Sequence, residues 1–364
     1  IEQRRRFIEN RFSKLNEMQL KAVMATEGPL LILAGAGSGK TTVLINRIAN
    51  LLTFGRASDS DELPMCADER ALELLRSDSE DAVPYAALDR VEPWRILAIT
   101  FTNKAADELK TRLGDMLGDA ANDIWACTFH SACVRILRRD AERIGYPASF
   151  TIYDTSDSQT VAKHILKDMD IDEKLLPHKA ALAAVSRAKD EKIGAEEYLK
   201  CARLSGDIRS IKLGEFYVDY MRRLFAAGAM DFDDLIYNTV VLLEQHEDVR
   251  DYWQRRFEYV LIDEYQDTNH LQYLLASLLA GGRGNLCVVG DDDQSIYKFR
   301  GASIENILSF EEQYKGCRTI RLERNYRSTG HILSAANSVI RHNTGRKGKE
   351  LWTNCDMGDK LRLT

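Results

Sequence analysis

The chain has 364 residues, of which 45% are hydrophobic and 29% charged, an ordinary balance for a globular protein. This length allows about two or three domains, and no apolar run approaches the roughly 20 residues that a membrane-spanning helix needs, so we predict no membrane partner. The net charge of −6 argues against a nucleic-acid partner only if the acidic residues are spread along the whole chain.

The start of the chain and its cysteines bear on the cell compartment. The first six residues, IEQRRR, lack the apolar core of a signal peptide, and the missing initiator Met leads us to expect a chain trimmed at its front. Seven cysteines are scattered without a C-x-x-C pair. This pattern argues against a zinc site and favours reduced thiols in a bacterial-type cytoplasm.

The first predicted elements are a strand at residues 28–34 and a helix at 41–52, joined by a glycine-rich loop. The run GPLLILA is short and almost wholly apolar, which is typical of a strand buried on both faces in a parallel sheet. Apolar residues recur at helical spacing in the second segment. A strand, a glycine-rich loop and a helix in this order begin a βαβ unit.

The loop itself, AGAGSGKT at 34–41, matches the phosphate-binding pattern except that Ala34 stands where a Gly is usual. Lys40 would reach the β- and γ-phosphates of ATP, and Thr41 would ligate Mg²⁺. A glycine-rich turn with a chance Lys is the alternative, but it fits poorly between a buried strand and a helix. Small residues that let backbone N–H groups close around phosphates are Ala36, Gly37, Ser38 and Gly39.

The acidic residues are concentrated in one segment. Residues 55–93 contain 11 acids and 4 bases, a net charge of −7 that leaves +1 for the rest of the chain. We interpret this segment as a surface insertion that is disordered in part and carries one short helix near residues 71–75. The remainder of the chain can therefore still form a basic groove.

Further buried-type strands are predicted at 95–100, 124–128, 259–263, 285–290 and 319–322. The stretch from about 157 to 225 is helical in pattern and rich in charge. Strands that alternate with helices predict an α/β fold with a parallel sheet, into which the helical block is inserted as a subdomain.

The strand at 259–263 ends in a pair of carboxylates. Asp263 would hold Mg²⁺ through water, as such acids do in P-loop enzymes. Glu264 is placed to accept a proton from the attacking water. An apolar run that ends in two acids is by itself equally consistent with a solvated strand end, but downstream of the phosphate loop it indicates a nucleotide hydrolase.

These residues lie within a series of motifs that resembles superfamily 1 helicases of the UvrD/PcrA/Rep type. The acidic pair belongs to DEYQD at 263–267, which is similar to the DExQD form of that family's carboxylate motif. The other matching motifs, in the family's order, are LNEMQ at 15–19, ITFTNKAA at 99–106, TFHS at 128–131, VGDDDQSIY at 289–297 and LERNYRS at 322–328. The resemblance runs from about residue 15 to about 340, and the acidic insertion looks longer than the family's usual connection.

The resemblance implies a RecA-like P-loop NTPase with an inserted all-helical subdomain. We place the first RecA-like domain at 1–148 and 229–302, the helical subdomain at 149–228, and the truncated beginning of a second RecA-like domain at 303–364. Relatives continue well beyond this length. We therefore expect a fragment of a longer motor that binds ATP–Mg²⁺ and DNA weakly and does not unwind duplexes.

Several nucleotide contacts are also implied by the resemblance. Gln19 is implied to read adenine through its amide, and Tyr326 to stack on the adenine ring. Gln294 is implied to sense the γ-phosphate. Arg327 is implied to act as an arginine finger, which stabilises charge on the transferring phosphoryl group. Thr42 stands where some relatives have an Arg that packs on the adenine.

DNA contacts are implied in the same way. Aromatic rings implied to stack on bases are Phe101, Tyr297 and Phe299, the last standing where several relatives have Trp. Contacts to the DNA backbone, or links between the two sites, are implied for Asn103, Thr128, His130 and Arg300. Stacking suits a motor that must accept any sequence, because every base offers a π-face worth roughly 1–3 kcal/mol. The segment DFDD at 231–234 also resembles a family segment, without an assigned role.

The sequence thus predicts an ATP-dependent helicase that moves on single-stranded DNA, 3′ to 5′ by resemblance, and acts on tailed duplexes. Candidate protein partners are DNA repair or replication proteins. The nearest rival is the helicase part of a recombination helicase–nuclease. Two others are a P-loop phosphotransferase acting on a small molecule and a non-catalytic DNA-binding or clamp-loading module, which the aromatic motifs and the intact acids respectively disfavour.

Overall fold

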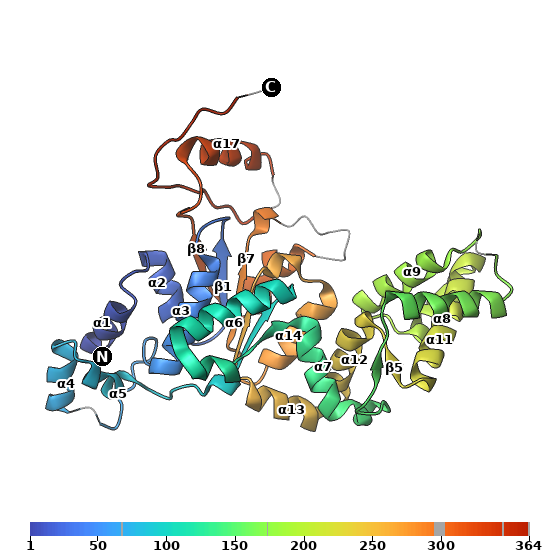
Figure 1. The fold of residues 1–364 in the computed structure, drawn as a ribbon, viewed down its shortest axis with the longest axis horizontal. Helices are drawn as coiled ribbons and strands as arrows, with labels where there is room; N and C mark the ends of the chain where they lie inside the picture. Colours follow the sequence, from blue (N-terminus) through green and yellow to red (C-terminus); the bar gives the residue numbers. More distant parts are fainter. Residues whose placement is uncertain (67, 173, 295–302, 344–345, 363–364) are drawn as a thin grey trace.

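A computed structural model describes residues 1–66, 68–172, 174–294, 303–343 and 346–362. Its centre is a six-stranded parallel sheet in the order β3-β2-β6-β7-β1-β8 (Figure 1). The strands are β1 (Leu30–Ala34), β2 (Ile96–Thr100), β3 (Trp125–Thr128), β6 (Tyr259–Ile262), β7 (Leu286–Gly290) and β8 (Arg318–Leu322). They coincide with the six stretches in which the sequence predicts strands, and the predicted α/β fold with a parallel sheet is confirmed.

Helices cover both faces of this sheet, which explains why its strands are apolar almost throughout. Leu30 and Ile32 point into one hydrophobic core, and Leu31 and Leu33 point into another. The first core is closed by α1 (Glu2–Arg11), α2 (Glu17–Met24), α3 (Lys40–Phe54) and α6 (Asn103–Leu117). The second is closed by α7 (Phe129–Asp140), α12 (Phe232–Gln245), α13 (Glu247–Arg256) and α14 (His270–Ala280).

The acidic insertion is more ordered than its composition predicts. The helix expected near residues 71–75 is present as α4 (Glu69–Arg76), followed by η1 (Glu80–Ala82) and α5 (Val83–Ala86). The composition predicts partial disorder, but the described residues 55–66 and 68–93 are ordered. Basic side chains of α1 bind the acids of this segment. Arg5 pairs with Asp61 at 2.9 Å, and Arg11 with Glu80 at 2.8 Å.

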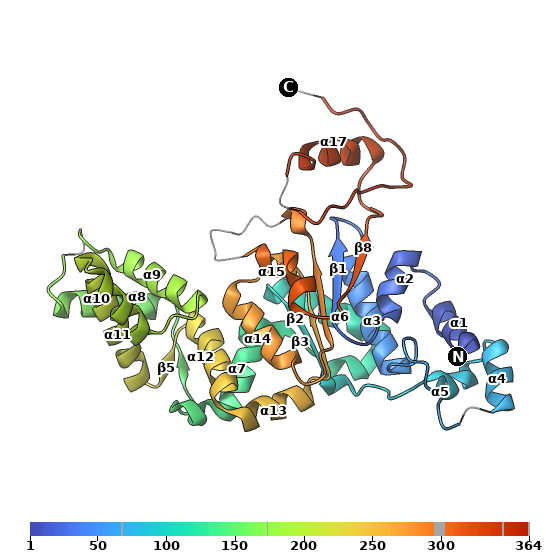
Figure 2. The same ribbon diagram turned by 180° about the vertical axis from the view of Figure 1, so that it is seen from behind.

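The helical block forms an arm that projects from one side of the sheet (Figures 1 and 2). It consists of α8 (Thr155–Asp168), α9 (His178–Asp190), α10 (Ala195–Ser205) and α11 (Ile208–Ala226). The arm has its own hydrophobic core, in which Phe216 and Tyr220 are fully buried. At its base the chain enters and leaves through two short paired strands, β4 (Thr151–Ile152) and β5 (Ala229–Met230).

The last part of the chain adds one strand to the six-stranded sheet and then continues away from that sheet. After α15 (Glu305–Leu308) and α16 (Phe310–Gln313), β8 pairs in parallel with β1 as the edge strand. Strand β8 thus lies after the predicted boundary at 302/303 and is hydrogen-bonded to the sheet that lies before it. The domain boundaries stay predictions. Helix α17 (Gly330–Ile340) lies beyond the carboxyl ends of the strands (Figure 1). None of the described helices is both long and apolar enough to cross a bilayer.

Candidate functional site

The loop between β1 and α3 has the backbone shape that a phosphate cradle requires. Gly37 and Gly39 have φ angles of +69° and +88°, in the left-handed region that side chains other than Gly rarely adopt. A Cβ atom on Gly39 would lie 2.6 Å from Nε2 of Gln19. The buried hydroxyl of Ser38 donates to the carbonyl of Gly35 at 2.7 Å and fixes the turn. Larger residues at the two glycines would therefore deform the loop.

The acidic pair faces this loop across the carboxyl edge of the sheet. The ammonium of Lys40, at the start of α3, donates to both carboxylate oxygens of Glu264 at 2.7 and 2.9 Å. Asp263, directly after β6, accepts a hydrogen bond from the backbone N–H of Glu264 at 2.9 Å. Two motifs more than 200 residues apart thus form a single charged cluster, as the sequence reasoning requires.

The cluster carries more negative than positive charge. Burial, together with the neighbouring Glu264, raises the pKa of Asp263 to about 6, against the opposing effect of Lys40. Burial likewise raises the pKa of Asp267 to about 6. A cation would relieve this repulsion, and carboxylate and hydroxyl oxygens are the ligands that Mg²⁺ prefers. Asp263 and the partly exposed Thr41 carry oxygens of these two kinds, and their role as magnesium ligands stays a prediction.

The backbone of Glu264 is strained. Its φ of +51° and ψ of +41° lie in the left-handed region, which is uncommon for a residue other than Gly. Such strain persists only where surrounding contacts hold it, and it is concentrated at functional sites. Here Lys40 and the amide of Gln266, at 2.9 Å from Oε2, hold the carboxylate in place.

Gln266 extends this cluster to the next strand. Its Nε2 donates to Glu264, while its Oε1 accepts from the backbone N–H of Asp291 at 2.9 Å. The backbone carbonyl of Asp291 accepts from the backbone N–H of Gln294 at 2.9 Å, and its carboxylate accepts from the side-chain amide of Gln294. The structure therefore links Lys40 to the predicted γ-phosphate sensor Gln294 through hydrogen bonds. Sequence reasoning quoted Gln266 within its motif but gave it no role.

The segment after β8 lies against the phosphate loop. Asn325 donates to the carbonyl of Ala36 at 2.6 Å, and the backbone N–H of Tyr326 donates to Gly37 at 2.9 Å. The ring of Tyr326 is 47% exposed, so it is not a core aromatic and can stack on a ligand. Arg327 is exposed, and its Cβ lies close enough to Gly37 to exclude a side chain there.

Helix α2 meets the same place. Gln19 donates from Nε2 to the carbonyl of Ser38 at 2.9 Å and accepts from the backbone N–H of Asn16. Asn16 also donates to the hydroxyl of Tyr326 at 2.7 Å. The residues predicted to hold adenine, Gln19 and Tyr326, are therefore connected through Asn16. Thr42, predicted beside them, is exposed on the first turn of α3.

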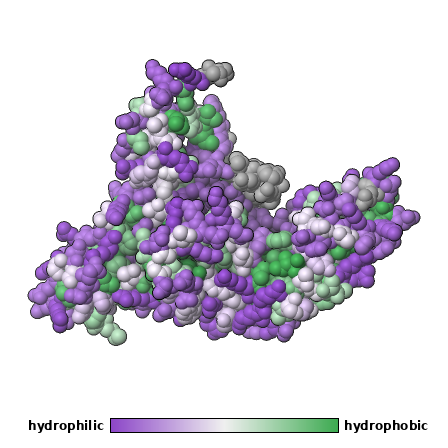
Figure 3. Space-filling model, viewed as in Figure 1, coloured by the Kyte–Doolittle hydropathy of each residue, from purple (hydrophilic) through white to green (hydrophobic). Residues whose placement is uncertain are grey.

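Four of the seven predicted DNA contacts line a cavity of about 640 Å³. Its lining includes Phe101, Asn103, Thr128 and His130, from the carboxyl ends of β2 and β3 and the first turns of α6 and α7. Hydrophobic residues appear on the surface where α7 and α12 meet the arm (Figure 3). The other three predicted contacts, Tyr297, Phe299 and Arg300, lie outside the described residues.

Aromatic rings and the N-termini of two helices lie together at the cavity. The ring of Phe101 is half-buried and lies edge-on to Phe129, with centroids 5.6 Å apart. Thr128 caps α7 by accepting from the backbone N–H of Ser131 at 3.3 Å. Burial lowers the pKa of His130, so its ring is neutral near pH 7. Helix N-termini attract phosphate, and rings stack on bases.

An exposed aromatic residue of the cavity was missed by sequence reasoning. Phe232 is 52% exposed, lines the cavity and lies edge-on to His130 at 5.7 Å between ring centroids. The available signal was the DFDD segment at 231–234, in which an aromatic side chain stands among acids. Only the fold brings this segment beside β3 and α7.

Comparison with known proteins decides the family. The family described as the UvrD/REP helicase N-terminal domain matches residues 15–71 and 81–315, which is most of the chain. The chain belongs to the UvrD/Rep helicase family. Residues 72–80, which separate the two matched ranges, lie in the acidic insertion.

Curated members of the UvrD/Rep family are similar over almost the whole chain. It is 47% identical to the ATP-dependent DNA helicase PcrA of Bacillus subtilis over 349 residues, which is 96% of this chain and 42% of that protein. The PcrA helicase of Staphylococcus epidermidis is 48% identical over 348 residues, 96% of this chain and 43% of that protein. The PcrA helicase of Staphylococcus aureus is 47% identical over 347 residues, which is 95% of this chain and 42% of that protein. The chain thus spans about two fifths of the length of these relatives.

In this UvrD/Rep-family chain a late segment also reaches the nucleotide site. The ammonium of Lys349 is buried among the carboxylates of Asp291, Asp292 and Asp293, with contacts of 2.7 Å to the first and 2.9 Å to the last. A Cβ on Gly35 would lie 2.2 Å from Leu351. The three carboxylates are close enough to share one cation, and the ammonium group of Lys349 occupies that position. No motif in the tail from 346 indicates this contact.

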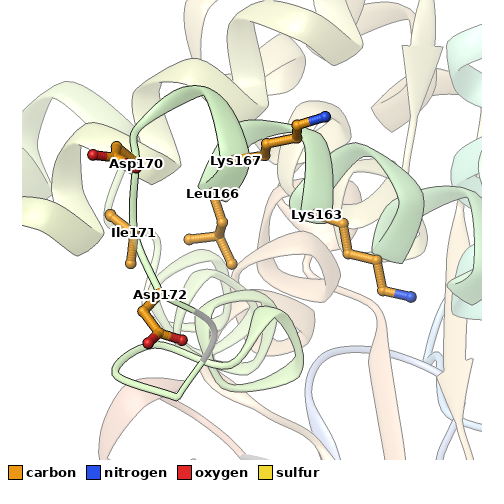
Figure 4. A pocket seen from close by; sticks show the side chains of 6 residues that line it. All are labelled: Lys163, Leu166, Lys167, Asp170, Ile171 and Asp172. Carbon is orange, nitrogen blue, oxygen red and sulfur yellow. The ribbon is translucent and has the colours of Figure 1, made fainter.

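A second cavity, of about 410 Å³, lies on the arm and contains none of the predicted site residues. It lies between α8 and the following loop. Leu166 and Ile171 face one another across it, whereas the ammonium groups of Lys163 and Lys167 extend away (Figure 4). Its basic groups therefore do not converge on a ligand.

Proposed function

We propose that this chain is the ATP-hydrolysing part of a DNA helicase that moves along single-stranded DNA. One observation carries the proposal: Lys40 and Glu264 meet at 2.7 Å, on the same sheet edge as a cavity with exposed aromatic rings. The names of the PcrA relatives, ATP-dependent DNA helicases, agree with it.

In the nucleotide half, Lys40 binds the β- and γ-phosphates, and Glu264 accepts a proton from the attacking water. Entry of a triphosphate draws Lys40 away from Glu264, which frees the carboxylate for that role. Thr41 and Asp263 would hold Mg²⁺, which would neutralise charge on the phosphates. Tyr326 and Gln19 contact adenine, and Arg327 stabilises the transferring phosphoryl group.

In the DNA half, bases stack on the rings of Phe101 and Phe232. Backbone phosphates approach the first turns of α6 and α7, where Asn103, Thr128 and His130 lie. Stacking on these rings accepts every base, because each base offers a π-face. The cavity therefore suits single-stranded DNA of any sequence.

Coupling between the halves runs through Gln266. Its side-chain amide donates to Glu264 and accepts from the backbone N–H of Asp291, three residues before Gln294. When the γ-phosphate is lost, Lys40 and Glu264 can pair with one another again. The hydrogen bonds from Glu264 through Gln266 to Asp291 transmit this change towards Gln294. For the full-length protein we propose 3′-to-5′ movement and tailed duplexes as substrates. Strand displacement by the full-length protein on 3′- and 5′-tailed duplexes tests both.

The first test concerns Phe101. In Phe101→Ala, the affinity for fluorescent oligo(dT) is expected to fall about fivefold or more, because one stacking ring is lost. Affinity for a fluorescent ATP analogue should stay within about twofold, since Phe101 makes no contact with the phosphate loop. Any stimulation of phosphate release by oligo(dT) should fall more than the basal rate.

Tyr252→Ala on α13, an exposed aromatic outside the cavity, is the matched control and should change neither affinity. Equal losses of nucleotide and DNA affinity in Phe101→Ala would remove the DNA role of this ring. ATP hydrolysis by the unmodified chain that neither binds nor responds to oligo(dT) would favour a small-molecule phosphotransferase instead.

A further inference from the structure

A lysine is completely buried where the helical arm joins the body of the molecule. Lys189, near the end of α9, has no exposed surface, and its ammonium pairs with Asp231 and Asp234 at 2.8 Å each. Both acids belong to the DFDD segment at the start of α12. A charge this deeply buried persists only when its partners are held in place.

The same acids organise the first turn of α12. Asp231 caps the helix by accepting from the backbone N–H of Asp234 at 2.8 Å, and the carboxylate of Asp234 accepts from the N–H of Asp231 at 3.2 Å. Tyr220, from α11 of the arm, donates its hydroxyl to Asp231 at 3.0 Å. Helices α9 and α11 of the arm therefore both bind the first turn of α12 through directional polar contacts.

Phe232 lies on this turn, between the two gripped acids. Asp231 and Asp234 are 9% and 0% exposed, whereas Phe232 is 52% exposed and lines the cavity beside His130. One side of the turn is thus locked into the arm, and the other presents an aromatic ring to the cavity. The direction of that ring depends on how the turn is held.

We propose that Lys189 is a positioning residue that holds the first turn of α12 so that Phe232 presents its ring to single-stranded DNA. This inference rests on the proposed function, because it takes the cavity to be the DNA site. It assigns the DFDD segment a role: its acids anchor the turn to the arm, and its aromatic residue faces the DNA.

Ordinary apolar packing would hold the arm to the body without fixing one turn so closely. A buried ion pair adds direction, because removing one partner leaves the remaining carboxylates unpaired and free to seek water. Without Lys189, the two acids repel one another across the turn. The expected result is a looser α12 N-terminus rather than a displaced arm.

Lys189→Met tests this inference, because Met fills a similar volume without the charge. Oligo(dT) affinity is expected to fall about fivefold or more, as after loss of a stacking ring, while affinity for a fluorescent ATP analogue stays within about twofold. In a Phe232→Ala background the same change should add little, because the ring that Lys189 positions is already absent. Backbone amides of the first turn of α12 should exchange hydrogen faster.

The matched control is Lys192→Met. Lys192 pairs with Glu244 at 2.5 Å, near the other end of α12, so this variant breaks a second ion pair to the same helix away from Phe232. It should leave oligo(dT) affinity unchanged. If Lys189→Met does not fold, Asp234→Asn keeps the Lys189–Asp231 pair and should show a smaller loss in the same direction.

Unchanged oligo(dT) affinity in folded Lys189→Met, or an equal loss with and without Phe232, would overturn the inference. So would unchanged hydrogen exchange in the first turn of α12. Failure of the unmodified chain to bind oligo(dT) has another meaning: it contradicts the proposed function, while hydrogen exchange still tests whether Lys189 holds the turn.

Discussion

At the scale of single residues, Lys40 and Glu264 neutralise one another, and a triphosphate competes for the same ammonium group. Glu264→Gln is expected to reduce phosphate release by at least about a hundredfold, because the proton acceptor is lost. ATP-analogue affinity should be retained or rise, since Lys40 loses a competing carboxylate. Lys40→Ala should lose both binding and hydrolysis.

Fluorescent-nucleotide titration and phosphate-release assays separate these two outcomes. Glu108→Gln on the surface of α6, which removes an exposed ion pair with Arg112, is the control and should behave as the unmodified chain. Normal turnover by Glu264→Gln would remove this residue from the proposed mechanism.

Asp190 shows how burial makes a single carboxylate sensitive to pH. Burial and then the neighbouring Asp233 raise the pKa of Asp190 to about 7, well above its ordinary value. The folded state thus binds a proton more tightly than the unfolded state, so this group's contribution to stability falls as pH rises through the interval up to about 7.

We expect Asp190→Asn to stabilise the fold at pH 8 by on the order of 1 kcal/mol, a figure reduced for partial exposure of the side chain. Asn can still accept the hydrogen bond that Asn269 donates at 2.6 Å. Urea unfolding at pH 8 and pH 4.5 measures the difference, which should nearly vanish at the lower pH. A difference of equal size at both pH values would contradict the assignment.

At the scale of elements, α1 organises the acidic insertion. The guanidinium of Arg4 is 2% exposed and donates to the backbone carbonyls of Ser60 and Glu62. Surface ion pairs such as Arg5 with Asp61 contribute at most about 1 kcal/mol. The buried Arg4 should therefore matter more than the exposed pairs, because its loss leaves two carbonyls without a donor.

Arg4→Ala is expected to expose residues 59–62, so that a nonspecific protease cleaves there several times faster. Arg6→Ala, which removes an exposed Arg from the same helix, is the control and should leave the cleavage rate unchanged. Mass spectrometry of the early fragments locates the cut. Equal cleavage of both variants would mean that Arg4 does not hold the insertion.

At the scale of the whole molecule, we propose that the two sites, which lie at one sheet edge, communicate through Gln266. The expected signature is thermodynamic coupling: an ATP analogue changes oligo(dT) affinity, and oligo(dT) changes nucleotide affinity by the same factor. Gln266→Met should bring that factor close to one, because the hydrogen bonds to Glu264 and Asp291 are lost.

Each affinity measured alone should change by no more than about twofold in Gln266→Met, since this side chain is 2% exposed and is assigned no ligand contact. Gln313→Ala on the exposed face of α16 is the control. Coupling that survives in Gln266→Met would show that the signal takes another route.

The sequence by itself determined those features that depend on neighbours along the chain. The glycine pattern at 34–41 gave the phosphate loop, and apolar runs located the six strands, because periodicity and backbone freedom are local properties. The resemblance added candidate residues at known positions in each motif. The residue roles taken from it remain predictions.

The tertiary structure alone decided which distant residues meet. Composition predicted a partly disordered insertion, whereas Arg4 and Arg11 of α1 bind its described residues. The resemblance placed a second domain after residue 302, and the structure adds that β8, beyond that point, pairs with β1. Lys189 with the DFDD acids, Gln266 with Asp291 and Lys349 with three aspartates belong to the same class. Their partners are separated by 25 to 58 residues, and no local spacing encodes such contacts, which arise only when packing brings the elements together.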